Sequence, residues 1–408
     1  MVVIRPCRTV QRDVGNDLQT TLRCRSDCHK LYSAVQGSTD APTAATLLID
    51  AEFSQPSSTS AQAIKLGADV ALEEIRSSNT LGTLSLNIRS SDNRGVPAIA
   101  VDNLLEAAKD PSLVAVMNGK FSPVQLELVP HVSKLGVLLL NPWGSADAIT
   151  DHEFSPRWTF RLSLKDEFAA FAFIREAKRR KARSIGVMLP TTAWGRSMST
   201  ALARRAREND LQIVGEVWYA FGEKSLIERY RSLHKSGAEI VICVANELEG
   251  AILVRELAAL PTSERKPVLA HWGITGGAFE SLAGDAIYDL DWSVIQTFSF
   301  HRHKHDRAAT LRQKVMQRLN TTRISDVESV HGIAHGYDLT WLLALALKQA
   351  GRVDRPAIRA EMEKIDRYDG AVRSYAPPFA PTKHDALDET DIFFARYMRG
   401  EGLVPIEG

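Results

Sequence analysis

The sequence lacks long hydrophobic runs and lacks an excess of either charge. No apolar stretch reaches the ~18 residues that a membrane-spanning helix needs, so we do not expect the chain to span a membrane. Lysine and arginine number 50, aspartate and glutamate number 49, and the net charge is +1. This balance provides no large basic surface, so nucleic acid is not an expected partner.

The chain also has few cysteines. Cys7, Cys24 and Cys28 lie near the start, and Cys243 stands alone in an apolar run, so the four do not form a disulfide framework. We expect Cys243 to be a small buried hydrophobic residue. The segment from Cys24 to His29 is similar to a haem-attachment motif but has one residue too many, which favours an incidental tail over a haem site.

Signatures of catalysis are missing as well. There is no G-x-S-x-G, no H-E-x-x-H and no Walker A lysine. The glycine-rich stretch 273–277 lacks the spacing of a phosphate loop, and we predict a tight strand-to-helix turn that orients His271 and Trp272. The histidines of 301–305 alternate and would share one face of a strand, but a solvated crossing is favoured over a metal site. We predict no enzyme, no metal and no cofactor.

A regular alternation of strand-like and helical segments is present from residue 45 onward. Hydrophobic residues make up 44% and charged residues 24%, which is typical of a globular chain. Short apolar runs alternate with segments whose apolar residues have helical spacing, and this pattern predicts parallel βαβ units. Because there are two such series, we predict an α/β fold with two doubly wound, parallel-sheet lobes.

The predicted elements fall into three groups. The strands of the first series are 46–50, 84–91, 114–119 and 137–142, and its helices are 58–75, a helix from Pro97, and 122–134. The strands of the second series are 184–190, 213–220, 240–245, 268–272 and 294–300, and its helices are 165–181, 194–209, 225–236 and 247–260. Late helices are predicted at 306–318, 329–350 and 355–365, with a last strand at 391–398.

Hydroxyl and aromatic side chains gather where the predicted strands end, which is where parallel sheets bind ligands. Serines there either cap helices or help free N–H groups hold an anion, and the two roles are compatible. Three tryptophans at different strand ends favour an aromatic-walled pocket over separate core positions. The candidate binding residues are Ser60, Phe121, Ser122, Trp143, Ser145, Trp194, Asn246, His271 and Trp272.

Four segments, in order, resemble one family: STSAQAIKLGADVALEEI, NPWGSADAIT, TTAWGRSM and HWGITGGAFESLAG. They are similar to motifs of the type I periplasmic binding proteins, and more closely of the leucine/isoleucine/valine-binding receptors of ABC transporters. The likeness covers roughly residues 45–400. It implies two lobes joined by a three-crossover hinge, with crossovers near 161–166, 298–302 and 375–390. The expected parts are a disordered or leader-like tail 1–44, lobe 1 from 45–163 and 301–375, and lobe 2 from 164–300 and 376–408.

The resemblance also assigns roles to the candidate residues. By position, Ser122 and Ser145, with Ser60 nearby and backbone N–H groups, would hold a ligand carboxylate, and Trp194 would cover the ligand. Trp272 falls where relatives keep an acidic residue for the ligand ammonium, and Asn246 falls where they keep a tyrosine. An aromatic or other organic acid therefore fits better than an α-amino acid, although Glu247 and Glu249 remain candidates for an acidic anchor.

The function that the resemblance implies is that of an extracytoplasmic solute-binding receptor. It would bind a small carboxylate-bearing ligand and present it to a membrane ABC permease from the periplasm. The first 45 residues contain no clear signal peptide, which keeps open a cytoplasmic ligand-sensing regulator on the same fold. An enzyme with two such domains, such as a glycosyltransferase, would need catalytic groups that the sequence does not offer.

Overall fold

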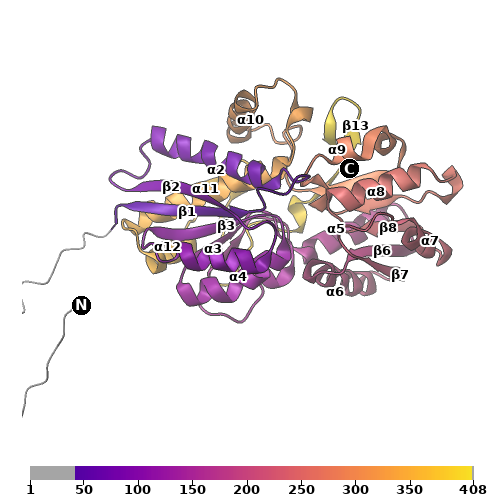
Figure 1. Ribbon diagram of the computed structural model, residues 1–408, viewed down its shortest axis with the longest axis horizontal. Coiled ribbons are helices and arrows are strands. Elements are labelled where there is room, and N and C mark those ends of the chain that lie inside the picture. Colours follow the sequence, from indigo (N-terminus) through magenta and orange to yellow (C-terminus); the bar gives the residue numbers. More distant parts are fainter. Residues whose placement is uncertain (1–41, 407–408) are drawn as a thin grey trace, which may run out of the picture. The chain divides into compact units, whose positions relative to one another are not determined.

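A computed structural model describes residues 42–406, which belong to one compact unit. The tail predicted for 1–44 lies almost entirely outside the described residues, as do Cys7, Cys24 and Cys28. Two mainly parallel sheets with helices packed on them confirm the predicted α/β class (Figure 1). In the described part of the chain, no helix is long and apolar enough to cross a membrane.

Lobe 1 is the part of the chain built around the first sheet. Its five parallel strands have the order β2-β1-β3-β4-β5. Their buried side chains form one hydrophobic core with those of six helices. The strands are β1 (Ala44–Ala51), β2 (Ser85–Asp92), β3 (Leu113–Asn118), β4 (Leu138–Asn141) and β5 (Thr159–Arg161). The helices are α2 (Ser60–Ser77), α3 (Pro97–Ala107), α4 (Ser122–Leu135), α10 (Asp306–Arg318), α11 (Val330–Ala350) and α12 (Arg355–Met362). A hairpin of two short strands, β11 (Tyr368–Asp369) and β12 (Ser374–Tyr375), follows α12.

Lobe 2 is built around the second sheet, whose order is β14-β13-β10-β9-β8-β6-β7. Its parallel strands are β6 (Ser184–Pro190), β7 (Gln212–Tyr219), β8 (Ile240–Cys243), β9 (Val268–Ala270) and β10 (Trp292–Gln296). An antiparallel hairpin, β13 (Phe393–Met398) and β14 (Gly402–Pro405), completes the edge beside β10. The helices are α5 (Asp166–Arg179), α6 (Ala193–Glu208), α7 (Ile227–Lys235), α8 (Glu247–Ala258) and α9 (Phe279–Ala283).

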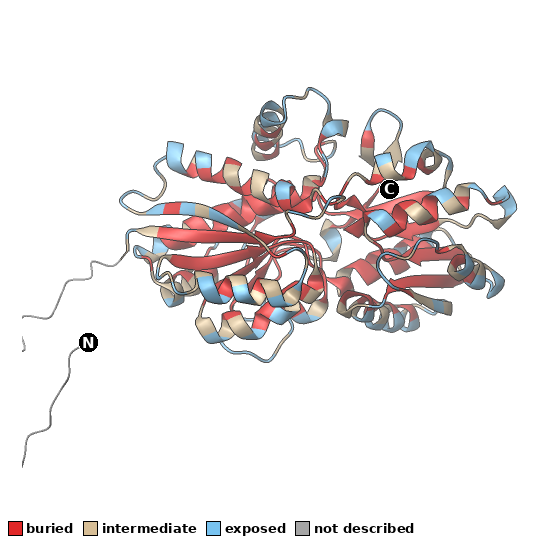
Figure 2. Ribbon diagram, viewed as in Figure 1, coloured by how far each residue is buried: buried red, intermediate tan, exposed pale blue. Residues whose placement is uncertain are grey.

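Burial follows the layers of each lobe. The strands are mostly buried, and most helices bury one face and expose the other (Figure 2). Helix α11 is an exception, because it is buried on almost every side from His331 to Leu347. Cys243 at the end of β8 is fully buried, as its apolar surroundings in the sequence predicted.

Several details of the predicted elements were wrong. The strand predicted at 294–300 spans Trp292–Gln296 instead, and β5, β11 and β12 were not predicted. The strand predicted at 268–272 ends at Ala270, and Trp272–Thr275 instead forms a single 3-10 turn. The last strand was predicted alone, whereas it pairs with β14 in a hairpin. The segment 402–405 is too short and too poor in alternating apolar residues to show a strand in the sequence.

Helices α2 and α11 pack so closely that only glycine fits at two contact positions. A Cβ on Gly67 would lie 1.9 Å from the carbonyl oxygen of Ile333, and one on Gly336 would lie 2.4 Å from that of Ile64. The two backbones therefore touch directly. This contact attaches the late helix α11 to the first helix of lobe 1, although more than 250 residues of sequence separate them.

The chain passes between the two sheets three times, after β5, after β10 and between β12 and β13. Arg161, fully buried at the end of β5, joins the first and third of these passages. Its Nε donates to Asp385 Oδ1 at 2.5 Å, and its Nη1 donates to the carbonyl oxygens of Ser145 and Ala146 at 3.1 and 2.9 Å. The Arg161 guanidinium also keeps the pKa of Asp385 low, although burial acts in the opposite direction.

Asp166 begins α5 immediately after the first passage. Its side chain is fully buried. Burial, followed by the negative charge of nearby Asp147, raises the pKa of the Asp166 carboxyl to about 7. The folded chain therefore favours the protonated carboxylic acid at this position.

Gly67→Ala should destabilise lobe 1, because the added methyl group collides with the carbonyl of Ile333. Overpacking of this kind reduces the free energy of unfolding by about 2 kcal/mol or more. Urea unfolding followed by circular dichroism measures the change. The exposed Ser77→Ala in the same helix is the control and should change little. Equal stability of Gly67→Ala and the native chain would contradict the close packing of α2 and α11.

Asp166→Asn should make the protein more heat-stable at pH 8 than at pH 5, relative to the native chain. A carboxyl whose pKa rises on folding supports stability below its unfolded pKa of about 4, and that support is lost as the pH rises to about 7. The amide cannot ionise and avoids this loss. Melting temperatures across pH 4–9 test the prediction, with the exposed Asp366→Asn as control. Parallel pH profiles for native chain and Asp166→Asn would contradict it.

Candidate functional site

A narrow pocket lies between the two lobes, at the carboxyl ends of strands from both sheets. The volume of the pocket is about 310 Å³ when the part open to solvent is included. Its enclosed part has room for about one water molecule. Lobe 1 contributes Lys120, Phe121, Ser122, Pro123, Trp143 and Ser145. Lobe 2 contributes Thr192, Trp194, Phe221, Asn246, Trp272 and Gly273.

Seven of the nine residues predicted from the sequence lie together in this pocket. They are Phe121, Ser122, Trp143, Ser145, Trp194, Asn246 and Trp272. They come from loops after β3, β4, β8 and β9 and from the start of α6, because the carboxyl ends of parallel strands in both sheets face the space between the lobes. Their role in binding remains a prediction.

Ser60 and His271 do not line the pocket. The Ser60 hydroxyl donates to Glu52 and is hydrogen-bonded to Ser58 at the start of α2. The His271 ring is fully buried, and burial lowers its pKa to about 3, so the ring is neutral. Its Nδ1 accepts from the Gly273 N–H at 3.3 Å, and its Nε2 lies 3.7 Å from Asp166 Oδ1. Both residues support the loops behind the pocket.

Ser122 joins the two lobe 1 loops that face the pocket. Its hydroxyl oxygen accepts from the N–H groups of Ser145 and Ala146 at 3.1 and 3.2 Å. The Ser145 N–H therefore already has an acceptor in Ser122. Nor does Ser122 cap its helix, because Phe121 occupies the N-cap position of α4. The proton of the Ser122 hydroxyl is what this side chain can offer a ligand.

The aromatic wall of the pocket consists of three tryptophans that are each almost fully buried. Trp143 and Trp272 approach from opposite lobes, with ring centroids 6.3 Å apart. His331 on α11 stacks on Trp272 at 4.6 Å, with the rings 8° from parallel. Trp194 Nε1 is buried and has no hydrogen-bond partner, so it can donate to an acceptor in the pocket.

Lys120 and Glu247 form a buried ion pair across the two lobes. Lys120 Nζ lies 2.8 Å from both Glu247 carboxylate oxygens, and the side chains are 2% and 4% exposed. The two residues are 127 positions apart, and the sequence gives no sign that they form a pair. Glu249, the other candidate anchor, does not line the pocket and instead accepts from the Gly222 N–H at 2.9 Å.

The glycine-rich stretch 273–277 is a contact between the lobes. The Gly276 carbonyl accepts from the N–H groups of Thr59 and Ser60, at 2.8 and 3.2 Å, and from the Ser58 hydroxyl at 3.1 Å. These donors are at the N-terminus of α2, where helix N–H groups need an outside acceptor. A Cβ on Gly277 would lie 1.8 Å from the Ser57 carbonyl oxygen, so this approach requires glycine.

The alternating histidines of 301–305 do not form a strand. They lie in the passage between β10 and α10, where His303 stacks on Phe298 with centroids 4.7 Å apart. Burial lowers the pKa of His303 to about 4. Over residues 42–406, no group of three or more His, Cys, Asp or Glu side chains is arranged to hold a metal ion.

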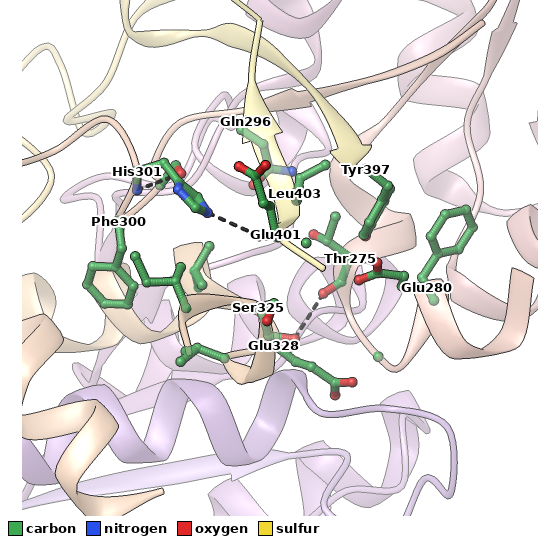
Figure 3. A pocket seen from close by; sticks show the side chains of 18 residues that line it. Thr275, Glu280, Gln296, Phe300, His301, Ser325, Glu328, Tyr397, Glu401 and Leu403 are labelled. Carbon is green, nitrogen blue, oxygen red and sulfur yellow. Dashed lines mark hydrogen bonds between the residues drawn. The ribbon is translucent and has the colours of Figure 1, made fainter. Parts of the chain in front are cut away.

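A second hollow of about 600 Å³ lies beside α9 and the β13–β14 turn (Figure 3). Glu280, Glu328 and Glu401 line it, and none of the predicted binding residues does. Glu328 and Glu401 are exposed, and Glu280 accepts from the Tyr288 hydroxyl at 2.6 Å. This acidic lining disfavours a carboxylate ligand, so the interlobe pocket is the better candidate site.

Comparisons with known proteins agree with this architecture. A search of curated proteins gives no match. A periplasmic binding protein type 1 from Bordetella pertussis Tohama I is 17% identical and has a TM-score of 0.79, over 89% of this chain and 99% of that one. The leucine-binding protein LivK from Thermotoga maritima is 16% identical with a TM-score of 0.74, over 89% and 98%.

A solute-binding protein of an ABC transporter from R. palustris, solved with 4-hydroxybenzoate, is also similar. It is 13% identical with a TM-score of 0.75, over 90% of this chain and 96% of that one. At such low identity these structures show a shared fold. The model of the periplasmic binding protein family matches residues 51–399, and the chain therefore belongs to the periplasmic binding protein family.

Proposed function

We propose that this protein is the solute-binding receptor of an ABC transporter and that it binds a small carboxylate-bearing ligand between its lobes. The observation that carries the proposal is the composition of the interlobe pocket. A lysine, a serine hydroxyl and an unpartnered tryptophan N–H can donate to a carboxylate, and three tryptophans can enclose an apolar body.

The ligand class is an aromatic or other organic acid or an amino acid, and the aromatic wall favours a ligand with a flat apolar body. Trp143, Trp194 and Trp272 offer flat apolar surfaces, and Phe121 extends this wall. The R. palustris relative in complex with 4-hydroxybenzoate is consistent with such a ligand, whereas the relationship to LivK keeps amino acids among the compounds to be tested. Trp272 stands where relatives keep an acidic residue for the ligand ammonium. Because an indole is uncharged and cannot form an ion pair with an ammonium group, this position supports an aromatic acid.

The composition of the same pocket supports a role in binding. Ser122 and Ser145 are its serines, and none of the described side chains that line it is a histidine or carboxylate placed to activate them. The enclosed space has room for about one water molecule, so the ligand would enter while the lobes are further apart. By contacting both lobes it would then stabilise the arrangement in which they close on it. A membrane permease would then recognise that arrangement from the periplasmic side.

The cytoplasmic regulator on the same fold is the competing function, and the location of the protein separates the two. Fractionation of cells that express the native gene should recover the protein in the periplasm. Recovery in the cytoplasm, together with ligand-dependent binding to a partner regulator, would contradict the transporter role while leaving the binding pocket intact.

Trp194→Ala should weaken binding of the ligand by about tenfold or more, because a buried aromatic side chain at the centre of a site contributes strongly. Ser145→Ala should weaken it less. Isothermal titration calorimetry with benzoate, 4-hydroxybenzoate, leucine and a wider carboxylate library measures the affinities. Phe154→Ala, at an exposed phenylalanine outside the pocket, is the control. Unchanged affinity in both pocket variants would contradict the assignment of this pocket as the binding site.

A further inference from the structure

The cation that lines the interlobe pocket already has an anionic partner. Lys120 is the cationic side chain among the pocket-lining residues, and its Nζ lies 2.8 Å from each oxygen of Glu247. Glu247 reaches it from the first turn of α8 in lobe 2. This geometry is that of a carboxylate held symmetrically by an ammonium group, which is also how a ligand carboxylate would be held.

The surroundings fix this pair in place. The Ser57 hydroxyl of lobe 1 donates to Glu247 Oε1 at 3.2 Å. Gly276 and Gly277 of lobe 2 lie against the two side chains, since a Cβ on Gly276 would be 3.2 Å from Lys120 Nζ and one on Gly277 would be 2.9 Å from Glu247 Cγ. The ion pair is therefore held within the lobe–lobe contact, with Lys120 also lining the pocket.

Charge balance limits what can join this pair. Both side chains are nearly inaccessible to water, and a buried charge without a partner is strongly unfavourable. A ligand with a single negative charge brings a second carboxylate to one lysine, so it must compete with Glu247. A ligand that also carries an ammonium group can place that group on Glu247 and leave both charges paired.

We propose that Glu247 is an internal competitor for the ligand carboxylate and thereby sets which carboxylates the pocket accepts. The proposal rests on the proposed function. Glu247 imitates a ligand carboxylate by occupying Lys120 across the lobes. Simple organic acids bind only by displacing it, whereas zwitterions use it as a second contact. The residue is thus a specificity determinant that works by opposing one class of ligand and assisting another.

The test compares Glu247→Gln with the native chain by calorimetry, using benzoate and 4-hydroxybenzoate as single anions and leucine as a zwitterion. Removing the competing charge should raise the affinity for the anions by about tenfold or more and lower that for leucine. Lys120→Met should abolish binding of the anions in both backgrounds. Glu249→Gln is the matched control, because Glu249 is an equally buried carboxylate of the same helix turn that accepts from the Gly222 N–H instead of pairing with Lys120.

A second readout guards against a general effect on folding. Thermal melting identifies any variant that does not fold, and Glu247→Ala repeats the test without a hydrogen-bonding amide. If a native chain that binds an organic acid keeps the same or weaker affinity for it in both Glu247 variants, this inference is overturned and the proposed function stands. If neither the native chain nor any variant binds a carboxylate, the proposed function falls and the inference falls with it.

Discussion

The buried guanidinium of Arg161 is the interaction on which the arrangement of the site depends. It donates to Asp385 in the third passage between the sheets and to the carbonyls of Ser145 and Ala146 in the loop that faces the pocket. A fully buried charge must be satisfied by partners held in place, so this one group defines where a passage, a strand end and a binding loop meet. The Ser122 hydroxyl then receives the two N–H groups of the same loop.

The two lobes meet through polar contacts of two kinds. At the N-terminus of α2, the N–H groups that a helix cannot satisfy internally donate to Gly276 of the other lobe. At the pocket, Lys120 and Glu247 meet as charges. Both contacts need close approach, and the glycines of 273–277 provide it. The stretch that resembles a phosphate loop in composition thus allows the two lobes to approach closely, because Gly276 and Gly277 have no side chains.

The fold could be predicted further than the site could. Apolar runs and helical spacing identified the strands and helices because most parallel strands are buried on both faces and most helices on one. The position of binding residues at strand ends follows from the same topology, and it found residues such as Trp194 and Asn246. The topology could not predict the Lys120–Glu247 pair. Contacts between lobes depend on how the lobes meet, and the spacing of residues in the sequence does not record this. His271 was assigned to the pocket because it follows the end of β9, but its ring is fully buried and does not line the pocket.

The stack of Trp272 on His331 joins an indole of lobe 2 to an imidazole of lobe 1, with neither ring open to water. Burial keeps the pKa of His331 well below its usual value, so the ring that faces the indole is uncharged. The emission of an indole depends on the polarity of its surroundings and on the groups that touch it. Separation of the lobes would expose both rings to water, so the fluorescence of Trp272 is expected to change when the lobes open.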